Sequence, residues 1–240
     1  MDEKIIYLEE VDSTNTFAAN LCRNGGKLPS AVVAESQTNG SGRMGRKFFS
    51  PQNDGIYMTY ILNTENVKTL NLITSAAGLA VAETLEKICN IRTHIKWPND
   101  IIVSSKKVCG ILTKLITENG KIRFALIGIG INVTNLSFPD EIKNIASSLK
   151  IETGKTFDKH IITELLVESL DKFFVEKILS EEEIVKEIKL RSCMLNKKVF
   201  VKSENREYFA VDISPDGGLK VLDGEEEKVI HNGEVELFDS

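Results

Sequence analysis

The sequence predicts an α+β fold, in which helices pack against a mixed or antiparallel sheet and a small β-barrel follows at the C-terminus. Residues 55–62, "GIYMTYIL", alternate like a strand with one buried face. Residues 68–90 repeat apolar side chains at helical spacing and predict a central core helix. After Cys193 the chain becomes a succession of short strands with turn signals. We therefore predict a first domain at 1–192 and a second at 193–240.

The remaining elements follow in chain order. "STNTFAANLCRNGG" reads as a helix with polar residues at its start and glycines at its end. Residues 31–35 are a short β-rich run, and residues 36–54 lack periodicity. Because long loops in compact domains are often functional, we expect the segment 36–54 to be part of a functional site.

The middle of the chain predicts a hairpin followed by two helices. "KVCGILTKLI" and "KIRFALIGIGINV" are β-like runs that Glu118-Asn119-Gly120 joins, and Asn-Gly is a strong hairpin signal. Helices are expected at about 158–178 and 181–192. The inward face of the first helix is predicted to carry Ile161, Leu165, Ser169 and Phe173.

Composition narrows the classes of function. The chain has 240 residues and a net charge of −5, and no apolar run approaches the ~20 residues that span a bilayer. The acidic N-terminus lacks a signal-peptide pattern, so we expect a cytoplasmic protein. Its mixed charges disfavour binding to DNA. The four cysteines and three histidines are scattered, which predicts reduced thiols and disfavours a structural metal site.

Two stretches near the N-terminus contain candidate ligand-binding residues. "DSTN" at 12–15 opens a helix, and it is either a plain N-cap or a place where hydroxyls and free N–H groups hold a polar ligand. "QTNGSGRMGRKFF" at 37–49 combines glycine with Arg43, Arg46 and Lys47. It is either a solvated surface loop or a flexible anion clamp that orders around its ligand.

Three further stretches lie in the middle of the chain. "KWPND" at 96–100 sets Lys96, Asn99 and Asp100 beside the single Trp, which is consistent with a nucleotide subsite or with a simple turn. Asp100 could hold Mg²⁺, which typically takes one or two carboxylates plus phosphates. Lys107 in "KKVCGIL" is either an exposed edge lysine or a site residue. "GIGINV" at 128–133 adds glycines and a polar strand end. This inventory of cations, glycines and amides favours electrostatic over covalent catalysis.

Taken together, these stretches resemble the biotin–protein ligases, also called biotin–[acetyl-CoA-carboxylase] ligases. The resemblance covers nearly the whole chain and implies a catalytic domain like that of class II synthetases, followed by an SH3-like β-barrel. It implies a two-step reaction with ATP and biotin as substrates and Mg²⁺ as cofactor. Biotin and ATP form biotinyl-5′-AMP, and a lysine of a biotin carboxyl carrier protein then takes the biotinyl group.

The resemblance also implies roles for individual residues. Arg43 and Lys107 would be catalytic. The residues implied to bind biotin are Ser13, Thr14, Asn15, Gln37, Gly40, Ser41, Gly42, Arg43, Lys107 and Gly110. The residues implied to bind ATP are Arg46, Phe48, Lys96, Asn99 and Asn132.

The chain departs from the family pattern at two places. Ser41 and Met44 stand where the family's loop commonly carries arginines. The loop therefore has two fewer cations with which to retain the intermediate. "DSTN" is reached at residue 12, so we expect no N-terminal helix-turn-helix and no regulation through DNA. We expect no membrane partner, and a homodimer is left open. Two other functions stay open: a lipoate– or octanoate–protein ligase or transferase, and a catalytically silent biotin-binding module.

Overall fold

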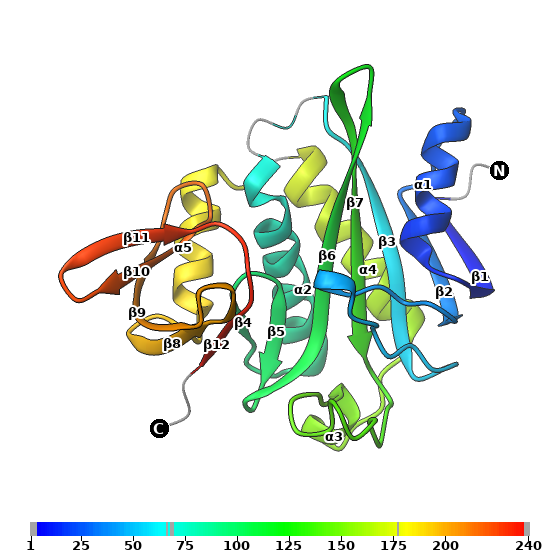
Figure 1. Ribbon diagram of the computed structural model, residues 1–240. Coiled ribbons are helices and arrows are strands. Elements are labelled where there is room, and N and C mark those ends of the chain that lie inside the picture. Colours follow the sequence, from blue (N-terminus) through cyan, green and yellow to red (C-terminus); the bar gives the residue numbers. More distant parts are fainter. Residues whose placement is uncertain (1–3, 66, 68–69, 177, 238–240) are drawn as a thin grey trace.

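The computed structural model describes residues 4–65, 67, 70–176 and 178–237 and contains two sheets (Figure 1). The larger sheet has seven strands in the order β1-β2-β3-β7-β6-β5-β4. Its strands are β1 (Ile5–Val11), β2 (Ala31–Gln37), β3 (Gly55–Asn63), β4 (His94–Lys96), β5 (Asp100–Val103), β6 (Lys106–Glu118) and β7 (Lys121–Asn132). The β1–β2 pair is parallel and the other neighbours are antiparallel, so the sheet is mixed.

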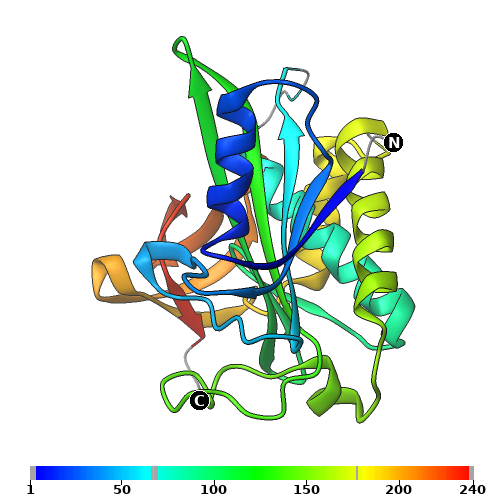
Figure 2. The ribbon, with the colours of Figure 1, turned by 90° about the vertical axis from the view of Figure 1, so that its right-hand side faces the viewer.

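Helices cover both faces of the larger sheet (Figure 2). Helix α1 (Thr14–Asn24) lies on one face, and α2 (Ile73–Cys89) and α4 (Lys159–Asp171) lie on the other. Side chains that alternate along the strands separate into two clusters, with Ile61 packing towards α1 and Tyr60 belonging to the main core. The prediction that 55–62 has one buried face is therefore wrong. All residues of β3 except Asn63 are buried, because α1 covers the face expected to meet solvent.

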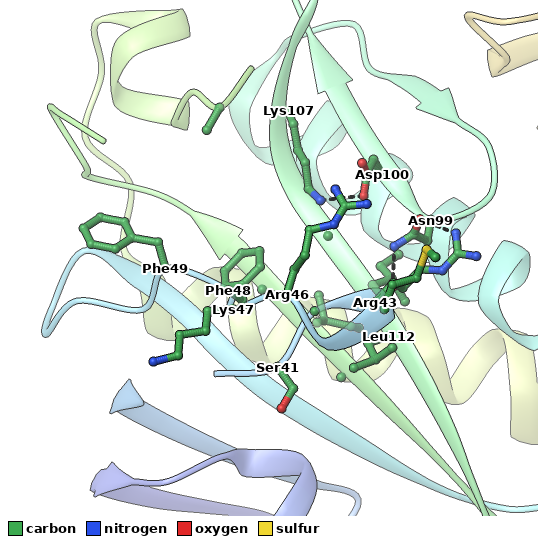
Figure 3. A pocket seen from close by; sticks show the side chains of 18 of the residues that line it. Ser41, Arg43, Arg46, Lys47, Phe48, Phe49, Asn99, Asp100, Lys107 and Leu112 are labelled. Carbon is green, nitrogen blue, oxygen red and sulfur yellow. Dashed lines mark hydrogen bonds and ion pairs between the residues drawn. The ribbon is translucent and has the colours of Figure 1, made fainter. Parts of the chain in front are cut away.

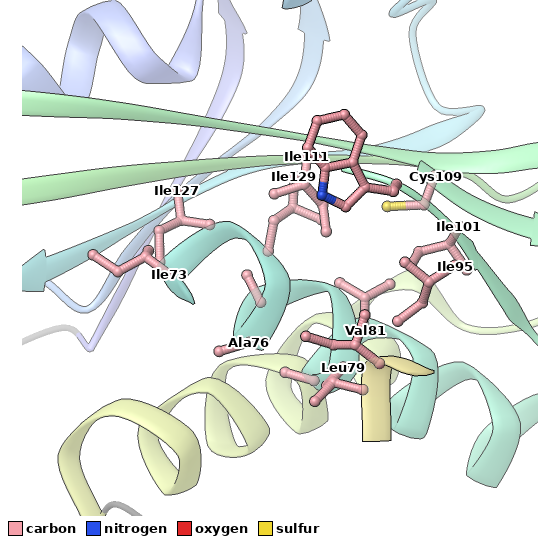
Figure 4. Close-up of a cluster of buried hydrophobic side chains, with 14 of the residues drawn as sticks. Ile73, Ala76, Leu79, Val81, Ile95, Ile101, Cys109, Ile111, Ile127 and Ile129 are labelled. Carbon is pink, nitrogen blue, oxygen red and sulfur yellow. The ribbon is translucent and has the colours of Figure 1, made fainter. Parts of the chain in front are cut away.

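The main core lies between the sheet and helix α2 (Figure 4). From α2 it takes Ile73, Ala76, Leu79 and Val81, and from the sheet it takes Ile95, Ile101, Cys109, Ile111, Ile127 and Ile129. The predicted core helix is thus confirmed from residue 73, after a short 3₁₀ turn at Leu70–Leu72, and residues 68–69 lie outside the described part of the chain.

The predicted hairpin is confirmed. Strands β6 and β7 pair along their length, and Glu118 lies opposite Lys121. Asn119 and Gly120 have φ values of 51° and 75°, the left-handed backbone that a two-residue hairpin turn requires.

The helical and N-terminal segments agree with the expectations only in part. The buried face of α4 carries Ile162, Leu166 and Leu170, one position later than predicted, and Ile161 is 51% exposed. Phe173 is buried as expected, within a π-helical turn at Lys172–Glu176, and residue 177 lies outside the described chain. Helix α5 (Glu181–Arg191) begins at a capping box formed by Ser180 and Glu183. Strand β1 and the short helix α3 (Leu149–Thr153) had no predicted counterpart.

The C-terminal strands form a five-stranded antiparallel sheet in the order β11-β10-β9-β8-β12. They are β8 (Lys197–Val201), β9 (Arg206–Ile213), β10 (Leu219–Asp223), β11 (Glu226–Ile230) and β12 (Val235–Leu237). Within the described residues no pairing joins β11 to β12. The buried side chains of the C-terminal sheet belong to the same cluster as the main core. A hydrogen bond also joins the two parts, because Trp97 Nε1 donates to Gly217 O at 2.9 Å. The boundary at residues 192/193 stays a prediction.

Across the described ranges, we find no helix with the length and apolar character that a membrane crossing needs.

Candidate active site

A cavity opens where the first turn of α1, the glycine–arginine loop, strands β6 and β7 and the C-terminal sheet meet (Figure 3). We use "glycine–arginine loop" for residues 40–48. The sequence-predicted site residues in the cavity wall are Ser13, Thr14, Asn15, Gln37, Ser41, Gly42, Arg43, Arg46, Phe48, Lys96, Asn99, Asp100, Lys107, Gly110 and Asn132. Gly40 does not line the cavity. A Cβ there would come 2.6 Å from Ser50 Oγ, so this glycine allows the loop base to pack closely.

One end of the cavity is a buried network of neutral hydrogen-bonding groups. The Thr59 hydroxyl donates to Thr14 Oγ1 at 2.9 Å, and the Thr14 hydroxyl donates to Gln37 Oε1 at 3.2 Å. Gln37 Nε2 in turn donates to Ser50 Oγ at 3.0 Å. Each side chain orients the next, so this end of the cavity is organised before any ligand arrives. We call Thr14, Asn15, Gln37 and Thr59 the polar end.

Ser13 lies at the N-cap position of α1, yet its side chain makes no capping hydrogen bond. Instead, Gln37 Oε1 accepts from the backbone N–H of Thr14 at 2.9 Å. Ser13 is 3% exposed and lines the cavity. The plain N-cap interpretation of "DSTN" is therefore wrong, because the helix start is satisfied by Gln37 and the Ser13 hydroxyl is left for another partner.

The glycines of β6 and β7 make room for site side chains. Gly110 and Gly130 lie opposite each other in the two strands, and a Cβ on Gly130 would come 2.4 Å from the Phe48 ring. A Cβ on Gly128 would come 2.3 Å from Asn15 Nδ2. A Cβ on Gly110 would come 3.0 Å from Lys107 Nζ and 3.3 Å from the Phe48 ring, so this glycine makes room for both side chains. Its contact with biotin stays a prediction.

The other end of the cavity is charged. Lys107 Nζ lies 2.7 Å from Asp100 Oδ1, and both side chains are partly exposed. Arg43 Nη1 donates to Asn99 Oδ1 at 3.2 Å, and Asn99 Nδ2 donates to Ile111 O at 2.8 Å. Burial lowers the pKa of Arg43, and the negative charge of Asp100 opposes that shift. We call Arg43, Arg46, Asp100 and Lys107 the charged end.

The glycine–arginine loop folds back on itself above this end. Phe48 N donates to Gly40 O at 2.9 Å, and Gly42 N donates to Arg46 O at 2.7 Å. Met44 has a φ of 54° and is 72% exposed at the tip of the loop. Figure 3 shows Arg46 reaching towards Asp100 and Lys107, whereas Arg43 lies beside Asn99.

Sequence reasoning missed several residues of the site. Thr59 of β3 does not line the cavity, but its buried hydroxyl orients Thr14, which does, and strand periodicity alone gave no functional signal for it. An apolar wall formed by Phe49, Phe138, Ile142 and Ile145 also lines the cavity, and the rings of Phe49 and Phe138 are 6.2 Å apart. Glu234 lies in the turn just before β12 and contacts Arg46. The turn signal at Asn232-Gly233 marked its neighbourhood but not its contact with the loop.

Asp100 is the residue predicted to hold Mg²⁺. Among the residues described here, no group of three or more His, Cys, Asp or Glu side chains could bind a metal ion. A single carboxylate still fits an Mg²⁺ ion that arrives on substrate phosphates, because Mg²⁺ keeps most of its other ligands as phosphate oxygens and water.

The cavity brings together the start of α1, a glycine-rich loop and three cations, Arg43, Arg46 and Lys107, an arrangement that suits small anionic ligands. Residues 7–132 match the family model "Biotin/lipoate A/B protein ligase family". The chain belongs to this family.

Several relatives of the chain are named as ligases. The bifunctional ligase/repressor BirA of Bacillus spizizenii is 40% identical over 162 residues, which cover 66% of this chain and 50% of that protein. The chain thus spans about half the length of this relative. The biotin–[acetyl-CoA-carboxylase] ligase of Mycobacterium tuberculosis is 26% identical over 94% of this chain and 86% of its own length. The chain is therefore homologous to biotin–[acetyl-CoA-carboxylase] ligases over most of its length.

The biotin protein ligase of Aquifex aeolicus in complex with biotin and ATP has a TM-score of 0.85, with 33% identity over 100% of both chains. The apo structure of the same ligase has a TM-score of 0.80 and 30% identity, over 99% of this chain and 100% of that one. The likeness confirms the expected α+β fold with its C-terminal sheet and the resemblance to biotin protein ligases.

Proposed function

We propose that this protein attaches biotin to a lysine of a biotin carboxyl carrier protein through biotinyl-5′-AMP. One observation carries the proposal: a single cavity joins a buried, neutral hydrogen-bonding end to a cationic end. The first complements the ureido group of biotin, and the second complements its carboxylate together with the α-phosphate of ATP. Relatives over most of the chain are biotin–[acetyl-CoA-carboxylase] ligases, which supports the same substrates.

The polar end favours biotin over lipoate. A ureido group offers two N–H donors and a carbonyl acceptor to Ser13, Thr14 and Asn15, whereas the dithiolane ring of lipoate offers no comparable partner. Buried polar groups left without partners lose free energy, so a hydrogen-bonding pocket discriminates against an apolar ligand.

In the first step, a carboxylate oxygen of biotin attacks the α-phosphorus of ATP, and the bond from that phosphorus to the pyrophosphate oxygen breaks. Both reactants are anions, so their approach needs positive charge. Lys107, Arg43 and Arg46 supply it from two sides of the cavity. Mg²⁺ bound with ATP would be held by Asp100 and phosphate oxygens, and it would add further positive charge there.

In the second step, the ε-amine of the carrier lysine attacks the acyl carbon, the bond from that carbon to the AMP oxygen breaks, and the amine's proton passes to solvent. The amine must be neutral to attack, and nearby cations such as Lys107 oppose its protonation. The glycine–arginine loop would limit access of water to the mixed anhydride until the carrier arrives.

The apolar wall gives the adenine base a place to lie. The rings of Phe49 and Phe138 and the side chain of Ile142 border the cavity. Aromatic and aliphatic surfaces favour stacking and burial of a purine, and its polar edge can remain at the rim.

Mass spectrometry of a purified carrier domain after incubation with the protein, biotin and MgATP tests the proposal. We expect one biotinyl group on one carrier lysine, together with release of pyrophosphate. Adenylate formation only with lipoate would assign the protein to the lipoate ligases. Biotin binding without pyrophosphate release would identify a catalytically silent module.

A further inference from the structure

The turn that leads into β12 contacts both arginines of the glycine–arginine loop. Gly233 O accepts a hydrogen bond from Arg43 Nη2 at 3.0 Å, and the Glu234 carboxylate pairs with Arg46. Gly233 has a φ of 120°, a conformation that favours glycine, and it thereby turns its carbonyl towards the loop. The C-terminal sheet therefore forms the surface on which the two loop cations lie.

The orientation of Glu234 is fixed from its far side. Glu234 Oε1 accepts from Lys202 Nζ at 3.0 Å, while Glu234 Oε2 faces Arg46. Lys202 also pairs with Glu236, at 2.6 Å. Burial alone would raise the pKa of Glu234, but hydrogen bonds from Lys202 and Arg46 outweigh it and lower the pKa. The carboxylate is thus charged at neutral pH, with one oxygen directed at the loop.

Arg46 contacts Glu234 through only one of its guanidinium nitrogens. The contact uses Nη2, and across the described chain the structure records no other hydrogen bond or ion pair of the Arg46 side chain. A guanidinium has five N–H donors in a planar fork, so the edge opposite Glu234 keeps its donors. Figure 3 shows the Arg46 head directed to the side of the cavity where Lys107 and Asp100 lie.

We propose that Glu234 is a positioning residue for the nucleotide: it anchors one edge of Arg46 so that the other edge faces the phosphates of ATP. The inference rests on the proposed function, which assigns phosphates to the charged end. The Arg46 side chain is 56% exposed, and an ion pair this exposed contributes little to folding stability. We therefore expect loss of the pair with Glu234 to change ligand binding rather than stability. An unanchored arginine would have to be ordered when ATP binds, and this entropic cost weakens affinity.

The test compares Glu234→Gln with Glu236→Gln. Both glutamates pair with Lys202, but Glu236 does not line the cavity, which makes it a matched control. We expect Glu234→Gln to raise the KM for ATP in pyrophosphate release by about fivefold to tenfold, with kcat within about twofold and the KM for biotin unchanged. Glu236→Gln should match the parent in all three quantities and in melting temperature.

A double-mutant cycle identifies the partner. If Glu234 acts through Arg46, the double variant Arg46→Met/Glu234→Gln should bind ATP no more weakly than Arg46→Met alone. Additive losses would overturn the role through Arg46. An unchanged or lower KM for ATP in Glu234→Gln would also overturn it, because the carboxylate would then only repel the phosphates.

Calorimetry with a non-hydrolysable ATP analogue separates this inference from the proposed function. If the parent binds the analogue but releases no pyrophosphate with biotin, the proposed function fails. The Kd values of the parent, Glu234→Gln and Glu236→Gln then decide the positioning role on their own. If the parent does not bind the analogue, both conclusions are overturned.

Discussion

The two ends of the cavity are built in different ways. At the polar end, Thr14, Asn15 and Thr59 are at most 5% exposed, and the hydrogen-bond chain from Thr59 through Thr14 to Gln37 holds them in place. At the charged end, the side chains of Lys107 and Arg46 are 29% and 56% exposed. The polar end is organised by the core, whereas the charged end depends on contacts between a loop, a strand and the C-terminal sheet.

This difference indicates that the two ends of the cavity serve different functions. A buried, ordered pocket costs little reorganisation when its ligand binds, and it discriminates through hydrogen bonds. Partly exposed cations on a glycine-rich loop can move to follow changing charge during the reaction. We therefore expect substitutions at the polar end to change biotin affinity and substitutions at the charged end to change rates and nucleotide binding.

The largest expected effect is at Lys107. Lys107→Met removes a cation and leaves the Asp100 carboxylate without its 2.7 Å partner, so pyrophosphate release should fall about 10²-fold to 10³-fold. Biotin affinity measured by calorimetry should change far less. Lys106→Met serves as the control, because Lys106 binds Asn144 O and does not line the cavity. Equal losses in both lysine variants would show that the strand entrance is simply destabilised.

The next effect is at the polar end. Thr14→Val removes the hydroxyl that links Thr59 to Gln37, and biotin affinity should fall by about tenfold to a hundredfold. At saturating biotin, the kcat for pyrophosphate release should stay within about threefold of the parent. Asn20→Ala on the exposed face of the same helix is the control. A large loss of kcat with unchanged biotin affinity would contradict the division between the two ends.

A smaller effect is expected at Arg43. Arg43→Gly removes the hydrogen bonds to Asn99 and to Gly233 O that hold the loop against the sheet and the C-terminal turn. Biotinyl-AMP should then escape about tenfold faster and label lysines of bystander proteins. The measurement is mass spectrometry of an added protein that is not a carrier. Retention of the intermediate equal to that of the parent would exclude Arg43 from holding the loop closed.

The smallest expected effect comes from a change of ionic strength, which compares the two ends without any substitution. Raising the ionic strength from about 0.05 M to 0.3 M shortens the Debye length and screens partly exposed charges. The KM for ATP should rise about twofold to fivefold, while the Kd for biotin changes by less than about twofold. Equal salt dependence of both constants would mean that the polar end also relies on charge.

Motifs with local causes were predicted well from the sequence. The Asn119-Gly120 turn was confirmed because positive φ at two successive residues is a local requirement that these residue types satisfy. The glycine end of α1 and the core of α2 were confirmed because a glycine at a helix end and apolar spacing act within a few residues. The site residues gathered in one cavity as expected, with the exception of Gly40.

Expectations that depended on distant partners succeeded less well. The alternation in β3 gave no sign that α1 covers its second face, since that helix belongs to a segment about 40 residues earlier. Ile161 and Ile162 are both apolar neighbours in α4, and only packing against the core decides which one is buried.

The sequence by itself determined the chemistry that is available to this protein: a polar helix start, glycines that accept close neighbours, and cations on a pliable loop. Local backbone preference and residue type are enough to specify these features. Only the tertiary structure decided their partners. Gln37 rather than Ser13 satisfies the first helical amide, Phe48 fills the space over Gly110 and Gly130, and Glu234 holds Arg46. These contacts join segments far apart in the chain, and only the folded arrangement of strands, helix and loop brings those segments together, which no local pattern encodes.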